Sequence, residues 1–235
     1  MDVDEIKRPV PILCKTDAKV LELCAPSDVR NENGELTDIR IAPALLVARE
    51  STEITDTSVS EIAELFNEYT YLLGKMVRLA ELNADTLAEV VTAYFQLHPP
   101  AEIVERNAAC RKLPAKKMDD EFNKLTFGNL RNIISCIVKT DTDLHTIEEL
   151  RTQKLRSNFT KVYQNYIRDR DVYTHGILYF VMPEKTAVLR SMKKGEKIYL
   201  RVDREIFRDN LRTYKYLTTV LTEIKSRLQT NEPVV

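Results

Sequence analysis

The residues best suited to chemistry lie in the segment IRDRDVYTHGILYF, which spans positions 167–180. It contains Arg168, Arg170, Asp171 and His175. On a helix, Asp171 and His175 are one turn apart on the same face, and Arg168 lies seven residues before His175 on that face. A histidine moves protons near neutral pH, a carboxylate one turn away orients its ring, and arginines bind phosphate. These residue types favour metal-free phosphodiester cleavage, in which fixed positive charge meets the developing phosphorane.

The same segment also fits an ordinary end of a helix. A cationic side chain in the last turn interacts favourably with the helix dipole, and Gly176 is the expected left-handed cap after His175. With 3 histidines and many arginines in 235 residues, an arginine shortly before a histidine also arises by chance. A structural role therefore stays open beside the catalytic one.

The order of these residues also resembles a known family. Arg170-Asp171-x-x-x-His175, at the end of a long predicted helix, resembles the motif of the HEPN superfamily, in which an arginine and a polar residue precede a histidine. The segment LTFGNLRNII, residues 125–134, is similar to the helix start that several HEPN families carry before their motif helix. The resemblance covers approximately the range 57–176.

The HEPN resemblance implies a helical-bundle endoribonuclease that cuts RNA without a metal ion or another cofactor. It also implies a homodimer, in which two motif helices form one composite site. Carried over to this chain, Arg170 contacts the scissile phosphate, Asp171 positions its neighbours, and His175 is the general acid or base. Proteins of this kind act as toxins or in antiviral defence, so an antitoxin or a defence-system partner protein is also expected.

Tyrosines surround the motif at positions 163, 166, 173 and 179. Tyrosines at helical spacing are common in cores and interfaces, and they also stack on bases. Tyr173 and Tyr179, together with Arg168, are the expected RNA-binding residues beside the catalytic ones. The core interpretation of the tyrosines remains open, and with it an alternative function: a non-catalytic helical interaction protein that binds a partner chain.

Apolar residues recur three and four positions apart over most of the chain after residue 56, which predicts a mainly α fold. Thr86 and Glu89 form a capping box that predicts a new helix, and Thr146 with Glu149 predicts the start of the motif helix. The expected helices cover 57–82, 86–98, 101–111, 119–139, 146–175 and 204–228.

A small β hairpin is expected after Gly176, because the runs TAVLRSM and EKIYLRVD flank the turn sequence KKGE. The predicted organisation has three parts. Residues 1–56 form an irregular or partly β arm, residues 57–176 a HEPN-like helical bundle, and residues 177–235 the hairpin and a C-terminal helix packed on the bundle.

Composition narrows the classes of function. The net charge is −1, so a site for a polyanion must be a local basic patch. The 4 cysteines show no C-x-x-C spacing and the 3 histidines show no helical pair, so no metal site is expected. No apolar run approaches the length of a membrane span, and the first residues lack the apolar core of a signal peptide. A cytoplasmic protein with reduced thiols and no membrane contact is expected.

Overall fold

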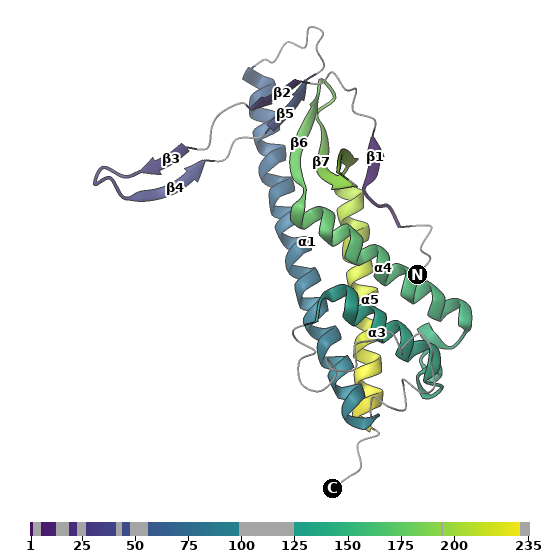
Figure 1. Cartoon of the computed structure of the whole chain (residues 1–235). Helices are drawn as coiled ribbons and strands as arrows, with labels where there is room; N and C mark the ends of the chain where they lie inside the picture. Colours follow the sequence, from purple (N-terminus) through teal and green to yellow (C-terminus); the bar gives the residue numbers. More distant parts are fainter. Residues whose placement is uncertain are drawn as a thin grey trace. The chain divides into compact units, whose positions relative to one another are not determined.

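Long helices dominate the computed structural model, which describes residues 1, 6–12, 19–22, 27–40, 44–47, 56–98, 125–193 and 195–230 (Figure 1). The predicted mainly α class is confirmed, and a small sheet accompanies the helices. The predicted helix over 101–111 lies outside the described residues.

The helices are α1 (Asp56–Leu97), α3 (Phe127–Thr140), α4 (Gln153–His175) and α5 (Arg204–Thr230), with short 3-10 helices η4 (Asp143–Thr146) and η5 (Glu148–Leu150). The strands are β1 (Val10–Ile12), β2 (Lys19–Glu22), β3 (Ser27–Arg30), β4 (Leu36–Arg40), β5 (Ala44–Val47), β6 (Ile177–Met182), β7 (Thr186–Lys193) and β8 (Glu196–Arg201).

The chain divides into two compact units, and each combines segments that are far apart in the sequence. The helical unit comprises Met1–Lys7, Met76–Arg170 and Arg208–Val235. The sheet unit comprises Arg8–Lys75 and Asp171–Phe207. Since α1, α4 and α5 each contribute to both, the units are described separately below.

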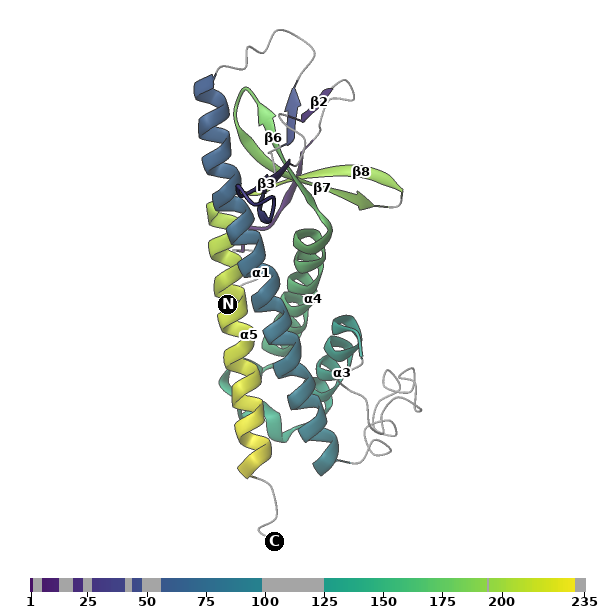
Figure 2. The same cartoon turned by 90° about the vertical axis from the view of Figure 1, so that its left-hand side faces the viewer.

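The core of the helical unit is formed by the apolar faces of its four helices. In α3, Leu130, Ile133, Ile134 and Ile137 are buried, as their spacing predicts. Within this unit α1 and α5 run side by side in the same direction, since Asn83 contacts Thr218 and Glu89 pairs with Lys225 (Figure 2). Other fully buried core residues are Leu87, Leu150, Phe159, Leu217 and Ile224.

A buried polar chain crosses this apolar core. The Tyr163 hydroxyl donates a hydrogen bond to Asn83 Oδ1, and Asn83 Nδ2 donates to Thr218 Oγ1 at 3.3 Å. Burial raises the pKa of Tyr163 well above its ordinary value, so the hydroxyl keeps the proton that it donates. Through these two hydrogen bonds, Asn83 of α1 connects the motif helix α4 to α5. The buried amide does not destabilise the core, because both of its polar groups have hydrogen-bond partners.

The sheet unit contains a six-stranded sheet in the order β1-β8-β7-β6-β5-β2. Neighbouring strands are antiparallel except β5 and β6, which are parallel. Aromatic side chains pack on strand β6 of this sheet: the ring of Tyr69 from α1 lies edge-on to Phe180 at 6.2 Å and to Phe207 of α5 at 5.7 Å. Strands β3 and β4 form a separate two-stranded sheet.

The predicted hairpin after Gly176 is confirmed. Strands β7 and β8 pair antiparallel, with Lys193 opposite Glu196, and the turn contains Gly195 at a φ of +83°. The positive φ explains the glycine in KKGE, because residues with a Cβ rarely adopt it. The hairpin is one part of a larger sheet, since β6 joins it on one side and β1 on the other.

The predicted helix break before Thr86 is wrong, because α1 continues without interruption through this position. The Thr86 hydroxyl donates a hydrogen bond of 2.9 Å to the carbonyl of Leu82, four residues earlier. A threonine inside a helix commonly makes this bond, so the sequence of a capping box does not by itself end a helix. The predicted end before Pro99 is confirmed, since α1 ends at Leu97.

The oxidation state of one cysteine differs from the prediction. Cys136 in α3 is disulfide-bonded, which contradicts the expectation of reduced thiols for this residue.

Among the described residues, none of the helices combines the length and the apolar character needed to cross a membrane.

Candidate functional site

Helix α4 carries the whole Arg170-to-His175 motif without interruption. Its start is not at Thr146, as the capping sequence predicts, but at Gln153: the Thr152 hydroxyl accepts a hydrogen bond of 3.2 Å from the amide of Leu155. Residues 143–150 form the short helices η4 and η5 instead. The side chain at Thr152 therefore fixes where the motif helix begins.

The segment 125–134, which resembles a HEPN helix start, packs against the part of α4 that precedes the motif, within the helical unit. Helix α3 begins within LTFGNLRNII: Thr126 is its N-cap and its hydroxyl accepts a hydrogen bond from the amide of Asn129. The ring of Phe127, the next residue, lies edge-on to Tyr163 at 5.9 Å and to Tyr166 at 6.4 Å. The apolar residue of this helix start thus positions the buried face of α4.

Helix α4 ends at His175, and the next residue leads directly into β6. The amide of Gly176 donates a hydrogen bond of 2.8 Å to the carbonyl of Val172. The expectation of a left-handed cap at Gly176 is wrong: the described glycines with positive φ are Gly34 and Gly195. A Cβ at position 176 would instead meet the Val172 carbonyl oxygen at 2.5 Å and Leu189 Cβ at 3.1 Å. Glycine is required here by the close approach of backbone and sheet.

Arg170 is engaged by a carboxylate from another helix. Its Nε donates to Glu81 Oε1 at 3.2 Å, and a second guanidinium nitrogen contacts the same oxygen. The Arg170 side chain is 26% exposed and that of Glu81 44%, so solvent reaches the pair. A phosphate that binds Arg170 must share the guanidinium with Glu81 or displace it.

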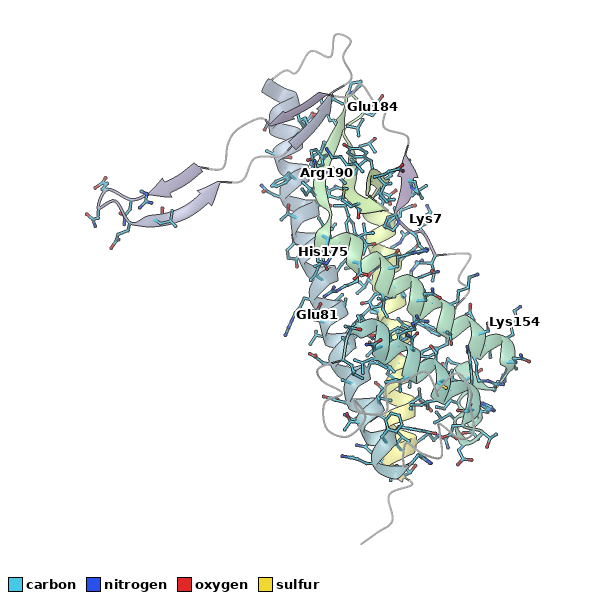
Figure 3. All side chains as sticks on the ribbon, viewed as in Figure 1. Lys7, Glu81, Lys154, His175, Glu184 and Arg190 are labelled. Carbon is cyan, nitrogen blue, oxygen red and sulfur yellow. The ribbon has the colours of Figure 1, made fainter. Side chains whose placement is uncertain are left out.

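His175 and Asp171 lie in the sheet unit, and both are exposed. They are one helical turn apart at the end of α4, and Figure 3 shows His175 at that end. Arg168, in the helical unit, is also exposed. An exposed histidine with a carboxylate one turn away can exchange a proton with a bound substrate, and such chemistry needs no rearrangement of the core.

Tyr173 and Tyr179, the tyrosines expected to bind RNA, are both buried. The Tyr173 ring packs on Phe207 at 5.8 Å. The Tyr179 ring is covered by the Arg190 guanidinium at 5.1 Å and lies edge-on to Tyr199 at 6.3 Å. A base can stack on either ring only after these neighbours move.

One residue of the site, Glu81, was not found from the sequence. Glu81 lies 89 residues before Arg170, and nothing in its helical surroundings distinguishes it from the other acidic residues of α1. The packing role of Gly176 was also missed, because the sequence suggests a cap at the same position. Leu189, which approaches Gly176 from β7, could be placed there only by the pairing of β6 with β7.

Comparisons of the chain with protein-family models, with curated proteins and with solved structures found no match.

Proposed function

We propose that this protein is a metal-independent endoribonuclease of HEPN type. The observation that carries the proposal is the exposed His175 at the end of α4, one turn after the exposed carboxylate of Asp171. His175 transfers the proton, and Asp171 orients its ring. The packing of Phe127 on Tyr163 adds support, because the segment 125–134 then contacts the same helix that carries the motif.

In the proposed reaction the RNA supplies its own nucleophile. The 2′-hydroxyl loses its proton and attacks the adjacent phosphorus, and the 5′-oxygen of the next nucleotide leaves and takes up a proton. Two proton transfers occur, whereas each chain offers one motif histidine. We therefore propose a homodimer with both histidines at one composite site, since two-fold dimers are the commonest assembly. A role as a toxin or antiviral-defence effector, regulated by a partner protein, follows from the same resemblance.

The purified protein should cleave single-stranded RNA in the presence of EDTA. The products should carry a 2′,3′-cyclic phosphate and a 5′-hydroxyl, which mass spectrometry of the fragments identifies. DNA of the same sequence should remain intact because it lacks the 2′-hydroxyl. Activity that disappears with EDTA and returns with magnesium would contradict the proposed chemistry.

The second candidate is a non-catalytic interaction protein, and the pairing of Arg170 with Glu81 favours it. In this case the only role of Arg170 is structural: its ion pair with Glu81 joins α4 to α1 within the helical unit. We expect instead that Arg170 acts on phosphate, so that Arg170→Lys lowers cleavage roughly tenfold, because lysine lacks the planar guanidinium fork. Initial rates with RNA, together with thermal unfolding of the same samples, measure this.

Glu81→Gln is the matched variant for this prediction. If Arg170 binds phosphate, Glu81→Gln should leave cleavage at the level of the unaltered protein or raise it, because the guanidinium no longer neutralises a carboxylate. If the role of Arg170 is only structural, Arg170→Lys and Glu81→Gln should lower the unfolding temperature by similar amounts, and neither should change the cleavage rate of the folded protein. That second pattern would assign Arg170 to the structure and not to the reaction.

A further inference from the structure

The exposed face of α4 carries a row of positive charge. Lys154, Lys161 and Arg168 all belong to the helical unit, and all three are exposed. They are spaced seven residues apart, which places them on nearly the same side of a helix. At a rise of about 1.5 Å per residue, neighbouring charges are about 10 Å apart along the helix axis. We call Lys154, Lys161 and Arg168 the α4 stripe.

On α4 itself, the neighbours of the stripe are neutral polar residues, apart from the acids beside Arg168. On an exposed helix face, Glu or Asp three or four positions from Lys or Arg can pair with it and offset its charge. Here those positions hold uncharged side chains or cations, apart from Asp171 after Arg168. Among the described residues, neither Lys154 nor Arg168 forms an ion pair. The neutral polar residues beside the stripe are Ser157, Asn158, Gln164 and Asn165.

Two cations of α5 pair with carboxylates of α1. Lys225 pairs with Glu89 at 2.9 Å, and Arg204 pairs with Glu68 at 2.6 Å. Within α4 itself, Lys154, Arg156, Lys161, Arg168 and Arg170 stand against Asp169 and Asp171, a net +3 in a chain of net charge −1. Of these cations, Arg170 is paired with Glu81 of α1. Asp169 is buried, so Asp171 alone places an acid on the exposed surface of this helix.

The stripe points along the helix toward the proposed catalytic residue. Continued by one more interval of seven residues, the same spacing along the unbroken helix α4 reaches His175. Figure 3 shows Lys154 near the start of α4 and His175 at its end. A polyanion that follows the stripe is therefore led along the motif helix.

We infer that the α4 stripe binds the sugar-phosphate backbone of single-stranded RNA. The inference rests on the proposed function for the choice of RNA among polyanions. Lysine and arginine neutralise phosphates irrespective of sequence, and the interleaved serine, asparagine and glutamine side chains can hydrogen-bond to sugar and phosphate. An anionic membrane fits less well, because a helix bound at a membrane surface needs an exposed apolar face. The apolar face of α4, with Phe159, Val162 and Tyr166, is buried in the core.

The test measures RNA binding in a background that does not cleave. The full-length His175→Ala protein is titrated into a fluorescein-labelled single-stranded RNA of mixed sequence, and anisotropy gives the Kd over a series of salt concentrations. Adding Lys154→Gln, Lys161→Gln and Arg168→Gln should weaken binding roughly tenfold or more at low salt. The slope of log K against log[salt] should become shallower by about 2, since each contact to a single strand contributes about 0.7.

A control triple variant removes the same charge elsewhere. Arg78→Gln, Lys215→Gln and Arg227→Gln alter exposed cations on α1 and α5, and should leave both the Kd and the salt slope near those of the parent. Equal losses in the two triple variants, unchanged binding in the stripe variant, or absence of RNA binding by the parent would each overturn the inference.

The inference and the proposed function fail in different ways. If RNA binds through the stripe but the unaltered protein does not cleave RNA, the α4 stripe is supported as a binding site and the proposed nuclease activity is contradicted. If the unaltered protein cleaves RNA but the stripe variant keeps the salt slope of the parent, the proposed nuclease activity is supported and RNA binding by the stripe is contradicted.

Discussion

Replacing His175 with alanine should lower the rate of RNA cleavage by roughly 10²- to 10⁴-fold, the usual contribution of a positioned acid or base. The change should leave the fold intact, because His175 is exposed at the end of α4 and, among the described residues, its side chain forms no hydrogen bond or ion pair. Single-turnover cleavage of labelled RNA in EDTA measures the rate. Circular dichroism and thermal unfolding of the same preparation show whether the protein is still folded.

His98→Gln is a suitable control for this experiment. His98 stacks on Tyr94 with ring centroids 4.5 Å apart in the helical unit, away from the motif in sequence, and its replacement should leave the cleavage rate unchanged. RNA cleavage that persists in His175→Ala would remove His175 from the mechanism. In a homodimer, mixing inactive His175→Ala with the unaltered protein should also lower activity per unaltered chain, since half of a mixed composite site is missing.

The features predicted correctly from the sequence depend on interactions within a few residues. The spacing of Leu130, Ile133 and Ile137 specified the buried face of α3, because a helix repeats every 3.6 residues. The turn sequence with Gly195 specified the β7–β8 hairpin, because that glycine adopts a positive φ. These signals are local, so they can be read without the fold.

Contacts between distant segments gave no comparable signal. Arg170 and Glu81 meet across 89 residues, and many acidic residues of α1 are equally plausible partners in sequence. The parallel pairing of β5 with β6 joins residue 44 to residue 179, although each strand is too short to show which strand it pairs with. The burial of Tyr173 and Tyr179 likewise depends on Phe207, Arg190 and Tyr199, which reach the rings only in the folded chain.

Threonines misled the prediction at two helix boundaries. Thr86 and Thr146 both precede a glutamate by three residues, which is the sequence of a capping box. In the structure each hydroxyl donates to a backbone carbonyl, that of Leu82 for Thr86 and that of Asp143 for Thr146. A hydroxyl can satisfy an N-terminal amide or bond back to an earlier carbonyl, and tertiary packing decides between the two.

Gly176→Ala should lower the free energy of unfolding by about 1–3 kcal/mol, the usual cost of forcing a group into a space without room for it. The new methyl would lie 2.5 Å from the Val172 carbonyl oxygen and 3.1 Å from Leu189 Cβ. The carbonyl belongs to the helix backbone and accepts the hydrogen bond from the Gly176 amide, so it cannot move away without weakening the last turn of α4. Denaturant unfolding followed by circular dichroism gives the change in free energy.

Gly74→Ala in α1 is the matched control, since it adds the same methyl at another glycine of the sheet unit. No atom lies within 4 Å of a Cβ at Gly74, and alanine is favoured over glycine inside a helix by about 0.5–1 kcal/mol. The two variants should therefore change stability in opposite directions. Because residue 176 directly follows His175, the shift forced by its methyl should also displace the end of α4, and the surviving folded fraction of Gly176→Ala should cleave RNA more slowly than Gly74→Ala. A Gly176→Ala protein as stable and as active as Gly74→Ala would show that the close approach at the end of α4 is not needed for either property.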